Sequence, residues 1–188
     1  MNPKLQIIIC STRPGRIGPA VARWFLDRAT SHGGFDAECV DLADFRLPVF
    51  DEPRHPRLQQ YEHPYTQRWA QSVARADAYT FVTPEYNHSP PPSLVNALDF
   101  LYREWNYKPC AFVSYGGGAG GVRAVQQAIL QVTMLKMMPI PESVAVQHAG
   151  SRIDGQGRFT PDAALDTAAQ GLLDELLRWC RALQPLRA

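Results

Sequence analysis

Residues 5–18 read LQIIICSTRPGRIG, and this stretch decides the fold. Its first part, residues 5–10, is almost entirely apolar, as is typical of a strand buried on both faces of a parallel sheet. A short polar loop follows, and then Ile17, Val21 and Trp24 recur at helical spacing. A buried strand, a tight loop and a helix in this order predict the first half of a strand–helix–strand unit.

The same alternation continues to the end of the chain. Further strands are expected at 35–42, 78–83, 110–115 and 143–147, and further helices at 65–76, 93–105, 122–137 and 161–183. The proline-rich segment 43–64 is typical of a long surface loop, with at most a short helix. Five strands separated by helices predict an α/β fold with a doubly wound parallel sheet, helices on both faces and one domain over residues 1–188.

The composition is that of an ordinary globular protein. The chain has 188 residues, 45% of them hydrophobic and 20% charged, with a net charge of +1. This balance does not favour a nucleic-acid surface or an anionic membrane as partner. No apolar run is long enough for a signal peptide or a membrane span. The four cysteines form no C-x-x-C motif and are expected to be buried, reduced thiols, which predicts neither disulfides nor a metal site and favours the cytoplasm.

Three unusual loops each follow a predicted strand directly. They cover residues 11–18, 84–92 and 115–121. In doubly wound sheets, ligands bind beyond the carboxyl ends of the strands, where the strand order reverses. We therefore expect the three loops to surround one pocket.

The loop 11–18 has the features of an anion clamp. It opens a helix, where unpaired backbone N–H groups and the helix dipole favour negative charge. Ser11 and Thr12 add hydroxyl donors, and Arg13 and Arg16 can bind a phosphate in a fork. It lacks the Gly-Lys-Ser/Thr ending of a nucleoside-triphosphate loop. An ordinary basic turn with two solvated arginines is the alternative.

The other two loops are suited to a planar heterocycle. The second, with sequence TPEYNHSPPP at 83–92, offers a stiff proline-rich wall, the ring of Tyr86 and the amide of Asn87. The third, with sequence SYGGGAGG at 114–121, lets its backbone approach a ligand closely. Its match to the dinucleotide motif G-x-G-x-x-G follows the fourth strand and lacks the downstream acidic residue, which disfavours that interpretation. A half-buried loop aromatic and a flexible glycine turn are the alternatives.

Taken together, these loops resemble the NADPH-dependent FMN reductase family, which includes quinone, chromate and azo-dye reductases. The resemblance covers residues 5–147 and rests on STR at 11–13, PEYNHS at 84–89, NALD at 96–99 and SYGG at 114–117. It implies a flavodoxin-like sheet of order 2-1-3-4-5. Departures at Pro91-Pro92, Val95 and Ala128-Ile129 leave the nicotinamide preference and the oligomer contacts open.

The resemblance also implies the residues of the site and the reaction. The FMN phosphate would be surrounded by Ser11, Arg13, Arg16, Ile17 and Gly18, and the ring and ribityl chain by Pro84, Glu85, Tyr86, Asn87, Ser114, Tyr115, Gly116 and Gly117. NADPH or NADH would be the co-substrate and a quinone, free flavin, azo compound or metal oxyanion the acceptor. No side-chain acid or base is required, because the flavin carries the chemistry. A homodimer or homotetramer is implied.

Two other functions remain open at this point. One is an FMN-binding electron carrier that uses a protein partner, although such carriers are usually strongly acidic and this chain is not. The other is a flavin-free regulatory or scaffold domain on the same fold.

Overall fold

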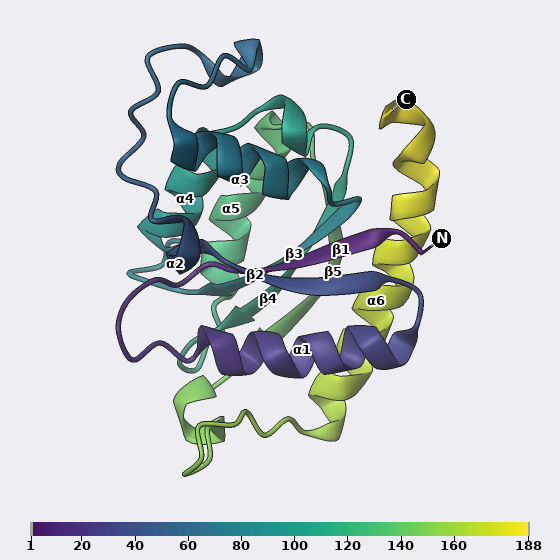
Figure 1. Cartoon of the computed structure of the whole chain (residues 1–188). Helices are drawn as coiled ribbons and strands as arrows, with labels where there is room; N and C mark the ends of the chain where they lie inside the picture. Colours follow the sequence, from purple (N-terminus) through teal and green to yellow (C-terminus); the bar gives the residue numbers. More distant parts are fainter. Residues whose placement is uncertain (1, 188) are drawn as a thin grey trace.

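The computed structural model describes residues 2–187, and its centre is one parallel five-stranded sheet (Figure 1). The strand order is β2-β1-β3-β4-β5, which confirms the predicted flavodoxin-like topology. Every neighbouring pair is parallel. The strands are β1 (Lys4–Ile9), β2 (Asp36–Asp41), β3 (Ala78–Pro84), β4 (Pro109–Tyr115) and β5 (Met138–Val146).

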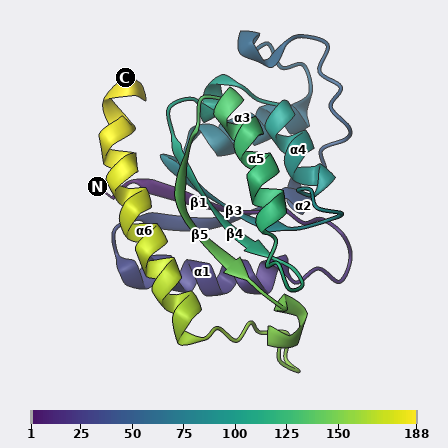
Figure 2. The ribbon, with the colours of Figure 1, turned by 180° about the vertical axis from the view of Figure 1, so that it is seen from behind.

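Helices cover both faces of this sheet. Figures 1 and 2 show α1 (Gly18–His32) and α6 (Ala163–Leu183) on one face, and α3 (Pro64–Ala74), α4 (Pro92–Asp99) and α5 (Val122–Met134) on the other. The short helix α2 (Leu42–Phe45) and the 3₁₀ turns η1 (Pro56–Leu58), η2 (Arg103–Trp105), η3 (Ala149–Arg152) and η4 (Gln184–Arg187) lie in the connections. The result is a three-layer α/β/α arrangement with an apolar core on each side of the sheet.

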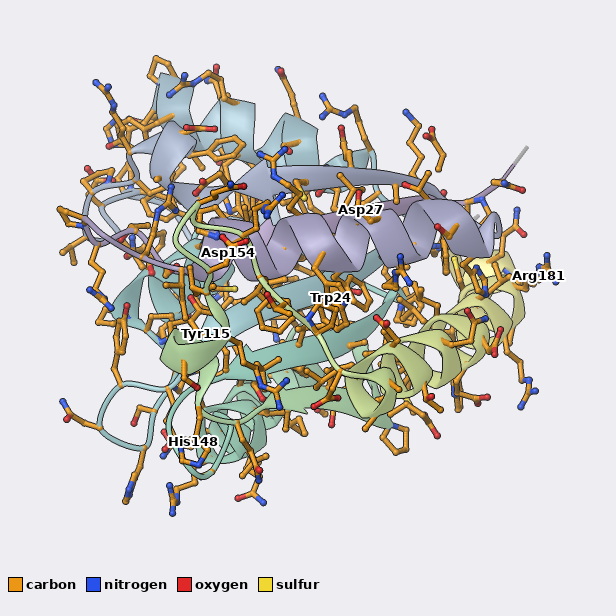
Figure 3. The ribbon with its side chains drawn as sticks, turned by 90° about the horizontal axis from the view of Figure 1, so that it is seen from below. Trp24, Asp27, Tyr115, His148, Asp154 and Arg181 are labelled. Carbon is orange, nitrogen blue, oxygen red and sulfur yellow. The ribbon has the colours of Figure 1, made fainter. Side chains whose placement is uncertain are left out.

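The first helix illustrates how the sequence sets an element. Pro19 lies in its first turn, where a missing N–H removes no intrahelical bond, and Gly33 ends it with a left-handed φ of 71°. Its Trp24 packs towards α6 and donates to Asp166 on that helix at 2.9 Å (Figure 3). This contact joins the two helices of one layer.

Three expectations about these elements were wrong. The helix expected at 93–105 ends at Asp99, and a separate 3₁₀ turn covers Arg103–Trp105. The strand expected at 143–147 begins already at Met138 and contains Pro139 and Pro141; it is an edge strand, where a missing N–H is tolerated.

The third correction concerns the cysteines. All four are free thiols, but Cys39 is exposed because it lies on the edge strand β2, whereas Cys10, Cys110 and Cys180 are buried. Among residues 2–187, no helix combines the length and the apolarity that a membrane crossing requires.

Candidate active site

The register of the sheet brings the three predicted loops to one edge. Ile9, the last residue of β1, lies beside Val82 of β3, and Pro84 at the end of β3 lies beside Tyr115 at the end of β4. Tyr115 in turn lies beside Val146, where β5 ends. The loops that follow β1, β3 and β4 therefore start at nearly the same level. This agrees with the rule that ligand-binding loops of a doubly wound sheet gather at the carboxyl ends of its strands, which we call the strand-end rule.

Direct contacts then join the first loop to the third. The Tyr115 hydroxyl donates to Ser11 Oγ at 3.0 Å, across 104 positions of sequence. Burial raises the pKa of Tyr115, so this hydroxyl remains a donor at neutral pH. Gly18 packs against the same pair: a Cβ there would lie 2.5 Å from Ser11 Oγ and 2.8 Å from the Tyr115 oxygen. Only glycine allows the helix start to approach this closely.

The loop after β1 presents unpaired backbone donors. Within residues 2–187, the N–H groups of Thr12, Arg13 and Arg16 donate no hydrogen bond to the protein. The loop leads into α1, whose N-terminus adds a partial positive charge. Free N–H groups at a helix start are the donors that a phosphate prefers.

The two arginines of this loop have different surroundings. Arg16 is half-buried and binds Asp41, the last residue of β2, with both terminal nitrogens at 2.6 Å, and it also donates to the Ser11 carbonyl. The hydrogen bond to Asp41 raises the pKa of Arg16. Arg13 is exposed and contacts only the Pro14 carbonyl, at 3.4 Å. Arg13 is thus free to bind an anion, whereas Arg16 holds the loop against β2.

A tight turn stiffens the loop after β3. Asn87 and His88 both have left-handed backbones, with φ of 50° and 65°. Tyr86 and Ser89 flank them and exchange two backbone hydrogen bonds, each of 2.9 Å. Two consecutive residues with positive φ between reciprocally bonded neighbours form a tight two-residue turn. This turn constrains the loop in addition to its prolines, and it places Asn87 at its exposed tip.

Glu85 ties this loop to helix α5. Its carboxylate accepts from the backbone N–H of Arg123 at 3.1 Å and from the Arg123 guanidinium at 3.0 Å. Burial alone would raise the pKa of Glu85, but the hydrogen bonds from Arg123 outweigh it and lower that pKa. The carboxylate faces the start of α5, so Glu85 fixes the loop after β3 relative to the glycine loop.

The glycine loop is anchored at both ends and free in the middle. Gly116 donates to the Val146 carbonyl at 3.2 Å, and the buried Ser114 hydroxyl donates to the Gly120 carbonyl at 2.7 Å. Between these anchors, the N–H groups of Gly117, Gly118 and Ala119 donate no bond within residues 2–187. These amides are available to a ligand.

His148 lies near this loop and was not among the residues expected from the sequence. His148 is exposed, has a left-handed φ of 48°, and donates its backbone N–H to the Gly117 carbonyl at 3.0 Å (Figure 3). It follows β5 at the same sheet edge, so the strand-end rule applied to a fourth loop would have indicated it. A non-glycine residue with positive φ has a strained backbone, and such residues cluster at functional sites.

A hollow of about 700 Å³ adjoins the first loop. Thr12 of that loop and Ser93 at the start of α4 border it, together with the apolar side chains of Leu42, Leu47 and Val49. It therefore offers an apolar surface next to the polar donors.

This donor set fits the flavin mononucleotide that the loops led us to expect. A phosphate needs several N–H donors and a free cation, which the loop after β1 provides through its backbone and Arg13. A ring with carbonyl groups at its edge needs amide donors, which Gly117 and Gly118 provide.

Comparison with known proteins gives the same family. The family model for NADPH-dependent FMN reductase matches residues 3–151. An NAD(P)H-dependent FMN reductase of Schizosaccharomyces pombe is 43% identical over 128 residues, which span 67% of this chain and 64% of that protein. A quinone reductase of Pseudomonas putida is 29% identical over 187 residues, which span 94% of each chain.

Solved structures share the fold. The flavoenzyme NAD(P)H:acceptor oxidoreductase FerB of Paracoccus denitrificans superposes with a TM-score of 0.75 at 22% identity, covering 96% of this chain and 98% of FerB. RosB, solved with a bound riboflavin-phosphate intermediate, gives a TM-score of 0.76 at 13% identity, covering 99% and 82%. The match of the family model over most of the chain carries the assignment: this protein belongs to the NADPH-dependent FMN reductase family, a family of oxidoreductases that use FMN and NAD(P)H.

Proposed function

We propose that this chain transfers reducing equivalents from NAD(P)H, through FMN bound at the carboxyl edge of the sheet, to a small acceptor. The observation that carries the proposal is the pairing of two groups of free backbone donors at this edge, at 12–16 and at 117–118, with the uncommitted Arg13. The first group suits a phosphate and the second a ring edge.

We assign the binding residues as follows. The phosphate end is held by Ser11, Arg13, Arg16, Ile17 and Gly18, and the ring end by Pro84, Glu85, Tyr86, Asn87, Ser114, Tyr115, Gly116 and Gly117. Arg13 contacts the phosphate directly. Arg16, Glu85 and Ser114 act through the loops that they brace, because their side chains are already engaged by Asp41, Arg123 and Gly120.

The protein's contribution is positioning and electrostatics. Bound FMN supplies the redox chemistry, so no acid or base from the chain is needed for it. The Gly117 and Gly118 amides favour negative charge at the ring edge, and this charge increases on reduction. The exposed turn at 87–88 leaves room for a second planar molecule to approach.

We propose a quinone as the favoured acceptor among quinones, free flavins, azo compounds and metal oxyanions. The quinone reductase of Pseudomonas putida and a 2-hydroxy-1,4-benzoquinone reductase of Burkholderia sp. align over more than nine-tenths of this chain, at 29% identity each.

The proposal can be tested with the purified protein. Reconstituted with FMN, it is expected to show flavin absorption that bleaches anaerobically with NADPH or NADH and returns on adding a quinone. Flavin absorption without bleaching would favour the electron-carrier alternative, and failure to bind FMN at all would remove the proposal.

The Arg13→Ala variant tests the phosphate end. We expect a loss of about 1.5–3 kcal/mol in FMN binding, from a charge-assisted bond to phosphate. Arg23→Ala is the matched control, because Arg23 is an exposed arginine on α1 without an ion pair among the described residues. FMN dissociation constants by fluorescence quenching measure both, and an unchanged value for Arg13→Ala would contradict the phosphate assignment.

We also propose that the chain is one domain that forms a homodimer or homotetramer in the cytoplasm. Leu130 and Met134 of α5 are 71% and 70% exposed and border two adjoining hollows, one of which is also lined by Phe50, 37% exposed. A contiguous exposed apolar patch is typical of a protein interface. Light scattering tests this, and we expect the Leu130→Glu variant to have a lower mass in solution than the parent protein. An unchanged mass would show that the interface lies elsewhere.

A further inference from the structure

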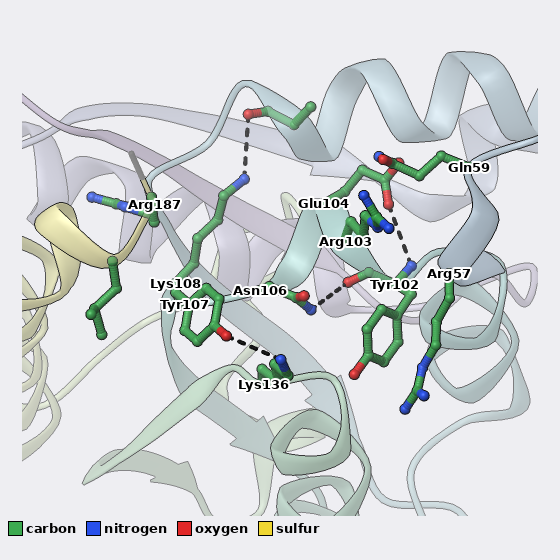
Figure 4. A pocket seen from close by; sticks show the side chains of 12 residues that line it. Arg57, Gln59, Tyr102, Arg103, Glu104, Asn106, Tyr107, Lys108, Lys136 and Arg187 are labelled. Carbon is green, nitrogen blue, oxygen red and sulfur yellow. Dashed lines mark hydrogen bonds between the residues drawn. The ribbon is translucent and has the colours of Figure 1, made fainter.

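A second polar hollow lies at the opposite edge of the sheet. It measures about 800 Å³ and is built where β4 and β5 begin, around the segments before Pro109 and Met138 (Figure 4). The seven residues of β4 separate it from the glycine loop, which corresponds to roughly 20 Å. The proposed FMN site does not use any of its residues.

The charge of this hollow is unbalanced. Among the described residues, five cations line it, namely Arg57, Arg103, Lys108, Lys136 and Arg187, against the carboxylate of Glu104 in the lining and that of Asp77 behind Arg187. The whole chain has 19 lysines and arginines against 18 acids, so this concentration is local. A cluster of like charges around a hollow raises the potential there and favours an anion.

Glu104 forms no ion pair with these cations. Its carboxylate accepts from the Tyr61 hydroxyl at 3.0 and 2.9 Å, from Gln59 at 2.9 Å and from the Tyr102 backbone N–H at 3.3 Å. It is buried beneath the hollow by these neutral donors. Glu104 therefore makes no ion pair within residues 2–187, and it remains one negative charge near Lys108.

Three of the cations have no acidic partner within residues 2–187. Arg57 lies over the ring of Tyr102 at 4.5 Å, Lys136 lies at the hydroxyl edge of Tyr107, to which it donates at 3.0 Å, and Arg103 makes no ion pair. Figure 4 shows the Tyr102 and Tyr107 rings on opposite sides of Asn106. Each ring therefore places a cation at the mouth of the hollow without neutralising it.

The other two cations are engaged more deeply. Lys108 is buried and donates to the Val73 and Ala74 carbonyls at the end of α3, at 3.1 and 3.3 Å. Arg187 contacts Asp77 at 3.4 Å. Asp77 therefore offsets the charge of Arg187, and burial lowers the pKa of Lys108 to about 8. Arg57, Arg103 and Lys136, in contrast, are exposed and free to contact a ligand.

The backbone at the mouth is strained. Gln59, Tyr107 and Lys136 have φ of 53°, 60° and 57°, in the left-handed region that these residue types rarely adopt. Tyr107 and Lys136 hold each other, because the Tyr107 N–H donates to the Lys136 carbonyl at 2.9 Å and Lys136 Nζ donates to the Tyr107 hydroxyl at 3.0 Å. Such strain clusters at functional sites, where it fixes side chains in place.

We propose that this hollow, which we call the amino-edge cleft, is a second binding site that takes a small anion with two or more phosphate groups. Arg57 and Arg103 supply the planar forks that suit phosphate oxygens, and Lys136 supplies a point charge from the other side. The site lies apart from the flavin loops, so it binds its anion whether or not FMN is present.

The test is a titration of the FMN-loaded protein with inorganic pyrophosphate, by calorimetry at 150 mM salt. Saturable binding is expected at one site per chain. Arg57→Gln, Arg103→Gln and Lys136→Gln should each weaken it by about fivefold, the usual size of one exposed charge contact. Arg23→Gln, which removes the same charge from an exposed position on α1, should leave it unchanged.

A comparison of ADP with pyrophosphate distinguishes a nucleotide ligand from a free polyphosphate. Tighter binding of ADP than of pyrophosphate would show that the ligand is a nucleotide whose base uses the Tyr102 or Tyr107 ring, and equal affinity would show a free polyphosphate. Backbone amide shifts at Asn106, Tyr107 and Lys136 should follow the same curve. Absence of saturation, equal weakening by Arg23→Gln, or loss of binding with Arg13→Ala would overturn the proposal.

Discussion

The two edges of the sheet offer positive charge in different ways. At the carboxyl edge, the donors are mainly backbone N–H groups of residues 12–16 and 117–118, and two of the nearby arginines are bound by Asp41 and Glu85. At the amino edge, the donors are side chains, and Glu104, the one carboxylate among the described residues that line the cleft, accepts its hydrogen bonds from neutral groups. Positive charge therefore comes mainly from backbone N–H groups at the carboxyl edge and from cationic side chains at the amino edge.

This difference has consequences for substitutions. A site of backbone donors depends on the conformation of its loops, so changes to glycines and braces should affect it more than changes to surface charge. A site of side chains depends on the charges themselves, and removing one of its exposed charges should cost little stability. The following predictions test this contrast.

The largest effect is expected for Gly121→Ala in the glycine loop. Gly121 has a φ of 84°, and a Cβ there would lie 2.9 Å from the Tyr115 nitrogen and 3.0 Å from the Tyr115 oxygen. The backbone would have to shift, at roughly 2–4 kcal/mol of unfolding free energy. Gly117→Ala is the control, since its Cβ would meet nothing within 4 Å. Equal urea unfolding midpoints for the two variants would show that the site does not depend on the conformation of this loop.

Arg16→Ala should destabilise the fold, whereas Arg13→Ala should not. Without Arg16, the half-buried Asp41 keeps its charge and loses both short bonds, which we expect to cost about 1–3 kcal/mol of unfolding free energy. The exposed Arg13 has no such partner. Denaturant unfolding without FMN measures the stability of both variants. A loss of stability in Arg13→Ala alone would show that Arg13, and not Arg16, braces the loop.

Glu85→Gln should lower stability by about 1 kcal/mol at pH 7, through the weakened bonds from Arg123. The pKa of Glu85 is lowered in the fold, so its contribution is complete above the unfolded pKa of about 4.3 and is lost as pH falls through the lower folded value. The two proteins should therefore converge in acid. A difference that persists at low pH would assign the effect to packing rather than to charge.

The smallest effect is expected for Arg103→Gln in the amino-edge cleft. Arg103 is exposed and has no ion pair among residues 2–187, so the unfolding free energy should change by less than about 0.5 kcal/mol. FMN binding should be unchanged as well. A thermal shift of more than a few degrees would show that the cation has a structural role.

Much of the carboxyl edge could be predicted from the sequence. Apolar runs and helical periodicity indicated the five strands and their order of appearance, and the loops after the first, third and fourth strands carried unusual residues. The strand-end rule then places such loops together without knowledge of any contact. The errors arose where local pattern is weak, at the end of α4 and in the proline-containing edge strand β5.

The roles within the site could not be predicted in the same way. Arg13 and Arg16 are equivalent in sequence, and only the position of Asp41, 25 residues after Arg16, separates the free arginine from the brace. Glu85 and Arg123 are 38 residues apart and meet because the chain passes through β4 between them. Pairings over such distances depend on register, which composition does not encode.

By itself, the sequence determined the layered α/β fold, the edge where the loops gather and the family, because these follow from local periodicity and short motifs. The tertiary structure alone decided which charges are neutralised. Packing sets whether a cation meets a carboxylate or remains free, and for that reason the amino-edge cleft, drawn from segments around 57, 103 and 136 with no shared motif, became visible only in three dimensions.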